Sequence, residues 1–173
     1  RLSNALAALG IGRGDKIALV LPQRPETVVV HMAAYQLGAV AVPLSFLFGA
    51  EALEYRLVDS EARIAFVDPQ SQPNLASIRE RCPGVAHVVG VAGAREAWIT
   101  PYESLLDQAS SRYTPVVTRP ADPALLIYTS TGLHVAMTGV GMLFIAVMAF
   151  RAVGGQLTGR AAEGVMAALL YWY

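Results

Sequence analysis

The residues with the clearest chemical potential stand together near position 128. Leu125-Leu-Ile-Tyr128 has the composition of a buried strand and runs directly into Thr129, Ser130, Thr131 and Gly132. A strand that ends in hydroxyl and glycine residues is typical of loops that place backbone N–H groups around a phosphate. We therefore identify Thr129–Gly132 as the candidate phosphate-binding site, although this short run contains no lysine.

A second glycine-containing motif is in the wrong place for phosphate binding. Gly10, Gly12 and Gly14 form a GxGxG pattern, but they precede the apolar run Lys16–Leu21. A dinucleotide loop needs the order strand, glycines, helix, so that the phosphate meets a helix N-terminus. The order here predicts a turn.

Single reactive side chains elsewhere lack the partners that catalysis or metal binding requires. His31 and His87 lie in apolar patterns with no other histidine or cysteine at ligand spacing, so we predict packed or half-exposed histidines. Cys82 follows Arg79 and Arg81, and basic neighbours can lower a thiol pKa. With no paired histidine, a structural cysteine is the simpler interpretation, and we assign no catalytic residue and no metal site.

The elements that must position the candidate loop alternate along the chain. The apolar runs expected to form strands are Lys16–Leu21, Ala39–Val42 (stopped by Pro43), Arg63–Val67, Ala86–Val91 and Leu125–Tyr128. The helical patterns are Leu2–Leu9, Pro25–Leu37, Glu51–Asp59, Leu75–Cys82 and Pro101–Gln108. Such alternation predicts an α/β fold with a largely parallel sheet and helices on both faces.

Bulk composition bounds the partners. The 173 residues carry no net charge, which leaves no long-range field to attract nucleic acid. A single Cys82 excludes an internal disulfide. Arg1 is not followed by a signal-like segment, so we expect the start to be internal to a longer reading frame.

The composition changes after Ser130. Thr131–Phe150 contains no Asp, Glu, Lys or Arg, and only Arg151, Arg160 and Glu163 carry charge in the rest of the chain. A helix of that apolar length spans about 30 Å, the thickness of a hydrocarbon core. Two interpretations stay open, namely one or two long membrane-spanning helices, or a pair of buried helices in a soluble protein. We divide the chain into residues 1–130 and residues 131–173.

Residues 1–130 resemble the N-terminal domain of the AMP-forming acyl-CoA synthetases. The segments that carry the resemblance are Gly10–Pro22, Pro25-Glu26, Leu37–Ser45, Tyr55–Arg63 and Leu125–Ser130. The resemblance implies ATP, Mg²⁺ and coenzyme A as cofactors, and a small-molecule carboxylate as substrate. It also implies a cytoplasmic location for residues 1–130.

The same resemblance identifies what is missing. In the family the loop after the corresponding strand continues through Gly-Thr to a closing Pro-Lys-Gly that grips the ATP phosphates. Here Thr129 and Ser130 are kept, Thr131-Gly132 can be read as the later Thr-Gly pair, and the rest is absent. We also expect the later nucleotide motifs and the C-terminal lid to be missing, so the hypothesis is an incomplete, inactive ligase with a truncated sheet.

Residues 131–173 resemble a different family, the last two helices of subunit III of haem-copper (cytochrome c) oxidases. The resemblance rests on Thr131–Val135, the apolar span, Arg151, Glu163 and Ala168–Tyr173. It implies membrane association and packing against an oxidase subunit, and gives the alternative function of a membrane subunit acting through its tail. His134 would then be an intramembrane polar residue.

Two regions from different families suggest a chimera joined at the shared Ser-Thr-Gly, by genomic rearrangement or by sequence assembly. A non-catalytic α/β module that keeps only protein contacts is a third possibility. With the later strands gone, Leu125–Tyr128 should lie at an exposed sheet edge, and we expect low stability and aggregation.

Overall fold

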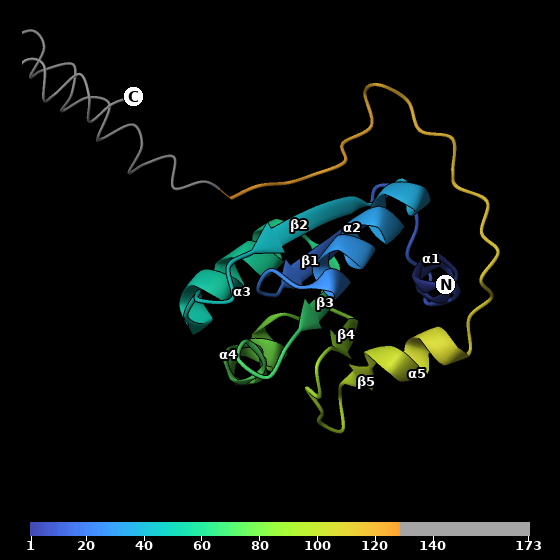
Figure 1. Cartoon of the computed structure of the whole chain (residues 1–173). Helices are drawn as coiled ribbons and strands as arrows, with labels where there is room; N and C mark the ends of the chain where they lie inside the picture. Colours follow the sequence, from blue (N-terminus) through green and yellow to red (C-terminus); the bar gives the residue numbers. More distant parts are fainter. Residues whose placement is uncertain (129–173) are drawn as a thin grey trace, which may run out of the picture. The chain divides into compact units, whose positions relative to one another are not determined.

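The computed structural model describes residues 1–128, which form one compact unit. The helices are α1 (Leu2–Ala8), α2 (Pro25–Leu37), α3 (Ala50–Asp59), α4 (Gln72–Ile78), the 3₁₀ turn η1 (Arg79–Arg81) and α5 (Tyr102–Asp107). The strands are β1 (Lys16–Val20), β2 (Val40–Leu44), β3 (Ala62–Val67), β4 (His87–Gly90) and β5 (Thr100–Pro101). Strands and helices alternate in chain order through most of this unit (Figure 1).

The strands form one 5-stranded sheet in the order β2-β1-β3-β4-β5, and every neighbouring pair is parallel. The predicted α/β class and parallel sheet are therefore confirmed. The chain leaves β1 to build β2 on one side and then returns to build β3 on the other. Beyond the carboxyl ends of strands that diverge in this way is the usual place for a ligand in parallel sheets.

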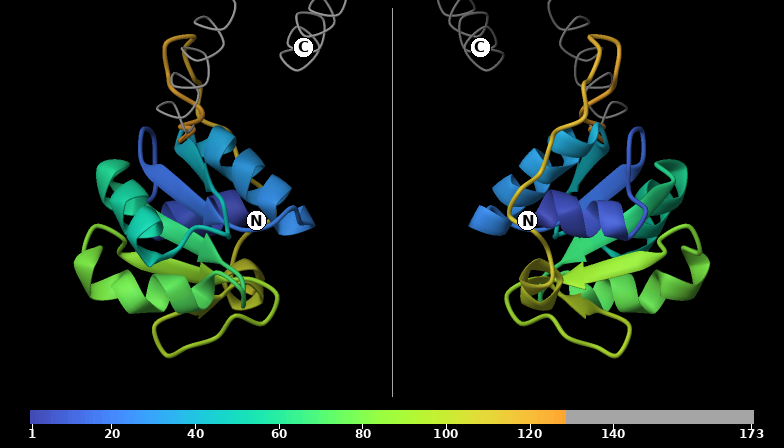
Figure 2. Two further views of the ribbon diagram at one scale, coloured as in Figure 1. Left: turned by 90° about the vertical axis from the view of Figure 1, so that its left-hand side faces the viewer. Right: turned by 90° about the vertical axis from the view of Figure 1, so that its right-hand side faces the viewer.

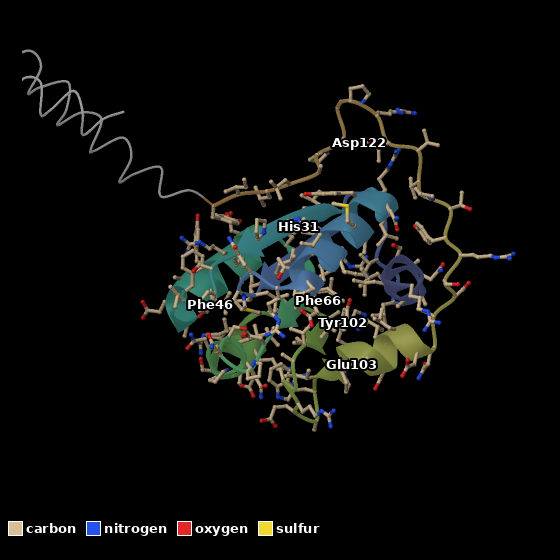
Figure 3. The ribbon with its side chains drawn as sticks, viewed as in Figure 1. His31, Phe46, Phe66, Tyr102, Glu103 and Asp122 are labelled. Carbon is tan, nitrogen blue, oxygen red and sulfur yellow. The ribbon has the colours of Figure 1, made fainter. Side chains whose placement is uncertain are left out.

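The sheet is covered on both faces, as the sequence predicts (Figure 2). Alternate residues of β1 divide between two apolar clusters, because side chains alternate across a strand. Ile17 and Leu19 pack beneath α1, α2 and α5, whereas Ala18 and Val20 pack beneath α3 and α4. Phe66 of β3 is fully buried in the first cluster (Figure 3).

The bounds of α2 coincide with the sequence prediction because both ends carry strong signals. Pro25 occupies the first turn, where its missing N–H costs nothing, and Arg24 before it is extended at φ −142°. Gly38 ends the helix in the left-handed conformation, at φ 65°. The α2 helix places Val30, Ala33, Ala34 and Leu37 against the sheet.

The prediction that Pro43 stops the second strand is wrong, since β2 continues through Pro43 to Leu44. Pro43 pairs in register with Leu19 of β1. On the other side of β2, the N–H of Ala41 donates to the carbonyl of Ala124. Because N–H groups alternate along a strand, the nitrogen of Pro43 faces the same outer side as that of Ala41. A proline is tolerated there because no ladder partner is lost from the sheet interior.

The predicted strand at Leu125–Tyr128 is also not a strand in the structure. It makes a single parallel bridge, Ala41 with Leu125, through Ala41 N to Ala124 O at 3.0 Å and Leu126 N to Ala41 O at 2.9 Å. The next donor on that side of β2 would be Pro43, which has no N–H. The ladder therefore ends after one bridge. The expectation of an exposed edge is confirmed, because Leu125 and Ile127 are 40% and 57% exposed.

The sequence pattern missed β5, which is too short for a periodicity to register. It follows a turn in which Ala92 and Gly93 both have positive φ, 53° and 87°. That turn folds back over the end of β4, where a Cβ on Gly90 would collide with the carbonyl of Ala94. Glycine is required there by the close approach.

The predicted apolar helical tail, residues 131–173, lies outside the described residues, as does its resemblance to an oxidase subunit. Among residues 1–128, none of the helices has both the length and the apolar character needed to cross a membrane.

Candidate functional site

The segment that leads to the candidate phosphate loop, residues 110–128, is here called the entry segment. Near its end it runs parallel to β2, through the Ala41–Leu125 bridge. It therefore heads toward the carboxyl end of the sheet, where parallel sheets bind ligands. The predicted site residues Thr129, Ser130, Thr131 and Gly132 follow it directly and lie outside the described residues. The geometry that the structure offers is that of the approach to this loop.

Polar contacts hold the first part of the entry segment. Asn4 of α1 donates to the carbonyls of Ser110 and Arg112, both at 2.7 Å. Further on, Arg13 donates to the carbonyl of Val117 and forms a 3.0 Å salt bridge with Asp122. Figure 3 shows Asp122 on this extended stretch, outside the helices and strands.

At the end of the entry segment, side-chain contacts rather than backbone hydrogen bonds hold the chain to the core. Leu126 and Tyr128 turn toward the cluster beneath α3 and α4, whereas Leu125 and Ile127 face outward. The phenol of Tyr128 donates to Asp59 Oδ2 at 2.6 Å, and its oxygen also lies 3.4 Å from the carbonyl of Arg56. Tyr128 is thus attached to the last turn of α3.

Arg56 completes this attachment by lying near two aromatic rings. Its guanidinium carbon is 4.1 Å from the ring centroid of Phe48 and 5.6 Å from that of Tyr128. Nη1 donates to the carbonyl of Ala52 at 2.7 Å, and Nε is buried without a hydrogen-bond partner among residues 1–128. We call Phe48, Arg56, Asp59 and Tyr128 the Tyr128 clamp.

The environment of the clamp keeps the phenol protonated. Burial, followed by the hydrogen bond to Asp59 and the charge of that carboxylate, raises the pKa of Tyr128 to about 12. A phenol that donates to a carboxylate forms a charge-assisted hydrogen bond, which is shorter and stronger than one between neutral groups. The phenol therefore remains a hydrogen-bond donor across the physiological pH range.

The GxGxG turn has the structural role that its order predicts. Gly10 and Gly14 adopt φ of 80° and 81°, and the N–H of Gly12 donates to Asp15 Oδ2 at 2.8 Å. The same carboxylate binds Arg63 at 2.9 Å. An acidic side chain already occupies the turn's N–H group, so this turn is not a phosphate cradle.

The histidine expectation is confirmed for His31, which is half-buried on α2. Its Nδ1 lies 3.2 Å from the hydroxyl of Tyr35, and burial lowers the pKa of its imidazole. His87 is likewise half-buried, at the start of β4. Within residues 1–128, no three His, Cys, Asp or Glu side chains gather closely enough to hold a metal ion.

The structural interpretation of Cys82 agrees with its 3% exposure. Burial raises the pKa of the thiol, with a further contribution from Glu54, and these outweigh the lowering by Arg81. The sequence suggested that neighbouring arginines could lower this pKa. The net direction is the opposite, because the thiol is desolvated more than it is paired.

Two other polar groupings are satisfied internally. Asp68, directly after β3, is buried and its Oδ1 accepts from the backbone of Gln70 and Ser71 and from the Ser71 hydroxyl. A cleft of about 520 Å³ lies at the amino end of the sheet. Its charged walls largely neutralise each other, since Lys16 pairs with Glu61 at 3.4 Å and Arg63 with Asp15. Cys82 also lines the cleft, but its thiol is buried and its pKa is raised, so neither grouping supplies an exposed nucleophile.

Sequence reasoning missed the clamp. The signal that could have found part of it is the spacing of Arg56 and Asp59, which places both on one face of a helix. No local pattern relates them to Tyr128, which is 69 residues further along the chain than Asp59.

Comparison with known proteins gives a consistent result. A family model described as AMP-binding enzyme matches residues 1–132. An acetyl-coenzyme A synthetase of Psychrobacter cryohalolentis is 30% identical over 150 residues, covering 75% of this chain and 22% of the relative. A human mitochondrial acyl-coenzyme A synthetase is 32% identical over 123 residues, covering 70% of this chain and 21% of the relative.

Solved structures agree with these sequence relatives. An anthranilate CoA ligase in complex with anthranoyl-AMP is 26% identical with a TM-score of 0.72, covering 75% of this chain and 25% of that one. The N-terminal domain of a Mycobacterium tuberculosis protein, FACL13, is 28% identical with a TM-score of 0.66, covering 75% of this chain and 32% of that one. This chain thus spans between a fifth and a third of the length of these four proteins.

Proposed function

Since this chain belongs to the AMP-binding enzyme family, we propose that residues 1–128 are the N-terminal scaffold of an AMP-forming acyl-CoA ligase. Such a ligase joins a carboxylate to coenzyme A at the expense of ATP. The observation that carries the proposal is the match of one family model across residues 1–132. These residues include the parallel sheet and the segment bridged to β2, which directly precedes Thr129–Gly132 in the sequence.

The substrate class follows from the relatives. Their names refer to acetyl, acyl and anthranilate CoA ligases or synthetases, all of which imply a carboxylic acid as acyl donor. We propose a small carboxylate for the complete enzyme, with ATP, Mg²⁺ and coenzyme A as co-reactants. The chain is neutral overall, so recognition would depend on the local site rather than on a long-range field.

The donor set of the candidate loop does not fit a complete ATP site. Thr129, Ser130, Thr131 and Gly132 supply hydroxyl and backbone donors, and the next residues are Leu133 and His134. Transfer at a phosphate needs cations that neutralise developing charge. Lys16 is the chain's only lysine, and it lies at the amino end of β1 in a salt bridge with Glu61. We therefore propose that this chain does not carry out adenylation.

Pyrophosphate exchange tests this part of the proposal. The full chain is incubated with ATP, Mg²⁺, labelled pyrophosphate and acetate, butyrate or benzoate in turn. We expect label in ATP no higher than in a blank without protein. Carboxylate-dependent exchange that is lost in Ser130→Ala would show a working site and overturn the proposal.

Nucleotide binding tests the remnant of the loop. With hydroxyl and N–H donors but no cation, we expect ATP to bind with a Kd of about 1 mM or weaker, roughly −4 kcal/mol. The measurement is NMR titration of the full chain, with Thr129→Ala and Ser130→Ala as variants. Micromolar binding would contradict a remnant, and the absence of any binding would remove Thr129–Gly132 from the proposed site.

A further inference from the structure

We infer that the Tyr128 clamp is a positioning device for the candidate phosphate loop, Thr129–Gly132. Arg56 and Asp59 are the positioning residues, because they tie Tyr128, the residue before the loop, to α3. The positioning role rests on the proposed function, since it presumes that the residues after Tyr128 are the ones that contact the phosphates of ATP. The attachment itself is a property of residues 1–128 and is tested separately below.

The backbone cannot do this positioning. The parallel ladder between β2 and the entry segment stops after Leu126 donates to Ala41, because Pro43 has no N–H for the carbonyl of Leu126. No other backbone hydrogen bond among residues 1–128 involves Ile127 or Tyr128. The side chains of Leu126 and Tyr128 therefore fix the last described residues before Thr129.

The charges of Arg56 and Asp59 are not committed to ion pairs among the described residues. Neither Arg56 nor Asp59 forms a salt bridge within residues 1–128, although both are charged and lie one turn apart on α3. Arg56 lies close to the rings of Phe48 and Tyr128, and Asp59 accepts a hydrogen bond from the phenol at 2.6 Å. Both residues converge on Tyr128.

Asp59 is also in a position that its own helix disfavours. It is the last residue of α3, where the partial negative charge of the helix C-terminus repels a carboxylate. Helix stability alone would select a neutral or basic residue there. The hydrogen bond to Tyr128 gives the carboxylate a role that offsets this repulsion, which favours a positioning function over an incidental surface contact.

The clamp links Tyr128, the residue before Thr129, to the core. Leu53 and Leu57 of α3 are buried in the same cluster as β3 and α4. A contact with α3 therefore transmits the position of a well-packed helix to the residue preceding Thr129. A residue paired in a ladder would be held by β2, whereas Tyr128 is held by α3, the helix that follows β2.

Hydrogen exchange of the full chain tests the attachment. We expect Tyr128→Phe to accelerate exchange at the Leu126 amide about tenfold, the lower limit for a hydrogen bond to a charged group. Asp59→Ala should do the same, and Asp59→Asn, which keeps an acceptor, should have a smaller effect. Tyr55→Phe is the control, since Tyr55 is on the same helix, is 62% exposed and is the smallest of the influences on the Tyr128 phenol.

A spectroscopic readout separates positioning from a general loss of stability. Tyr128 titrates with a pKa of about 12, so at pH 11 its phenol stays protonated. In Asp59→Ala the phenol loses its acceptor and the nearby charge, so its pKa should fall, while the part of the shift that burial causes remains. NMR titration of ring-labelled tyrosine should then show the Tyr128 phenol ionising at a lower pH in Asp59→Ala than in the parent chain, and Tyr128→Phe identifies its signal.

The outcomes are distinct. Unchanged exchange at Leu126 in both Tyr128→Phe and Asp59→Ala overturns the clamp, as does acceleration spread evenly over β1 and β3. Neither result depends on nucleotide. If the clamp variants accelerate exchange but leave ATP affinity unaltered where the parent chain binds ATP, the attachment stands and its positioning role is overturned. If the parent chain binds no ATP, Thr129–Gly132 are removed from the proposed site and the positioning role is overturned with them, whereas the attachment is still decided by hydrogen exchange.

Discussion

Residues 1–109 and the entry segment, residues 110–128, are held to the same sheet by different forces. The first region is fixed by two apolar clusters that sandwich the strands. The second is fixed mainly by individual contacts, such as those of Arg13 with Asp122 and of Tyr128 with Asp59. Packing is shared among many residues, whereas a polar contact belongs to one pair. The segment that leads to Thr129–Gly132 is thus open to change by single substitutions that leave the core folded.

The largest effect should be the difference in the free energy of unfolding between alanine variants of two leucines, one in each region. Leu19 is 1% exposed at the centre of the sheet, and Leu125 is 40% exposed at its edge. Leu19→Ala should lower the free energy of unfolding by about 2–5 kcal/mol, through lost burial and a cavity. Leu125→Ala should cost under about 1 kcal/mol. Chemical denaturation of both variants measures the difference, and equal losses would abolish the distinction between the two regions.

Loss of the Arg13 contacts should free the entry segment without unfolding the rest. Arg13→Ala removes the donor to Val117 and the salt bridge to Asp122, which is partly exposed and contributes about 1 kcal/mol or less. Limited proteolysis within residues 116–122 should accelerate several-fold while Tm shifts by only a few degrees. Arg95→Ala, at another exposed arginine, is the control. A large fall in Tm would show that the segment belongs to the cooperative core.

The exposed edge should govern self-association. Residues 124–128 carry no charged side chain, and Ile127 is 57% exposed. An uncharged apolar edge is a template for pairing with another chain. Ile127→Lys should raise the concentration at which the chain aggregates by a few-fold, as measured by light scattering, with little change in Tm. The same aggregation threshold in Ile127→Lys would place the self-associating surface elsewhere.

The smallest effect should be the pH dependence that His31 contributes. Burial lowers the pKa of His31 in the folded state, so the unfolded chain binds more protons near pH 6 and stability rises with pH there. The stabilisation is lost as pH falls below the usual histidine value of about 6.5. Because the ring is half-buried, we expect no more than a few tenths of a kcal/mol. Comparison of the parent chain with His31→Gln from pH 5 to pH 8 measures it, and a parent that gains stability on acidification would reverse the sign.

Much of the fold was predictable because its signals are local. Pro25 and Gly38 delimit α2, and the apolar run of β1 needs no partner to be recognised. The fate of Leu125–Tyr128 was not predictable from its own residues, which have good strand composition. It depends on Pro43, a residue far away in sequence that cannot donate to the ladder. Strand formation depends on the neighbour as much as on the strand.

The candidate site likewise has one part that the sequence could predict and one part that it could not. Thr129–Gly132 stood out from residue type alone, and their role stays a prediction because they lie beyond the described residues. The clamp did not stand out, since a tyrosine, an arginine and an aspartate are ordinary on a protein surface. Only the fold brings Tyr128 to Asp59.

The strand order also determines when, during synthesis, β1 can pair with each of its two neighbouring strands. Of the five strands of the described sheet, β1 is made first, yet its two neighbours are β2 and β3, so its second edge lacks its β3 partner until Val67 has been made. At about 5–20 residues per second, roughly 2 to 9 s separate Val20 from Val67. During that interval an apolar strand is exposed on one side. We expect the nascent chain to be most vulnerable to capture by chaperones in this window.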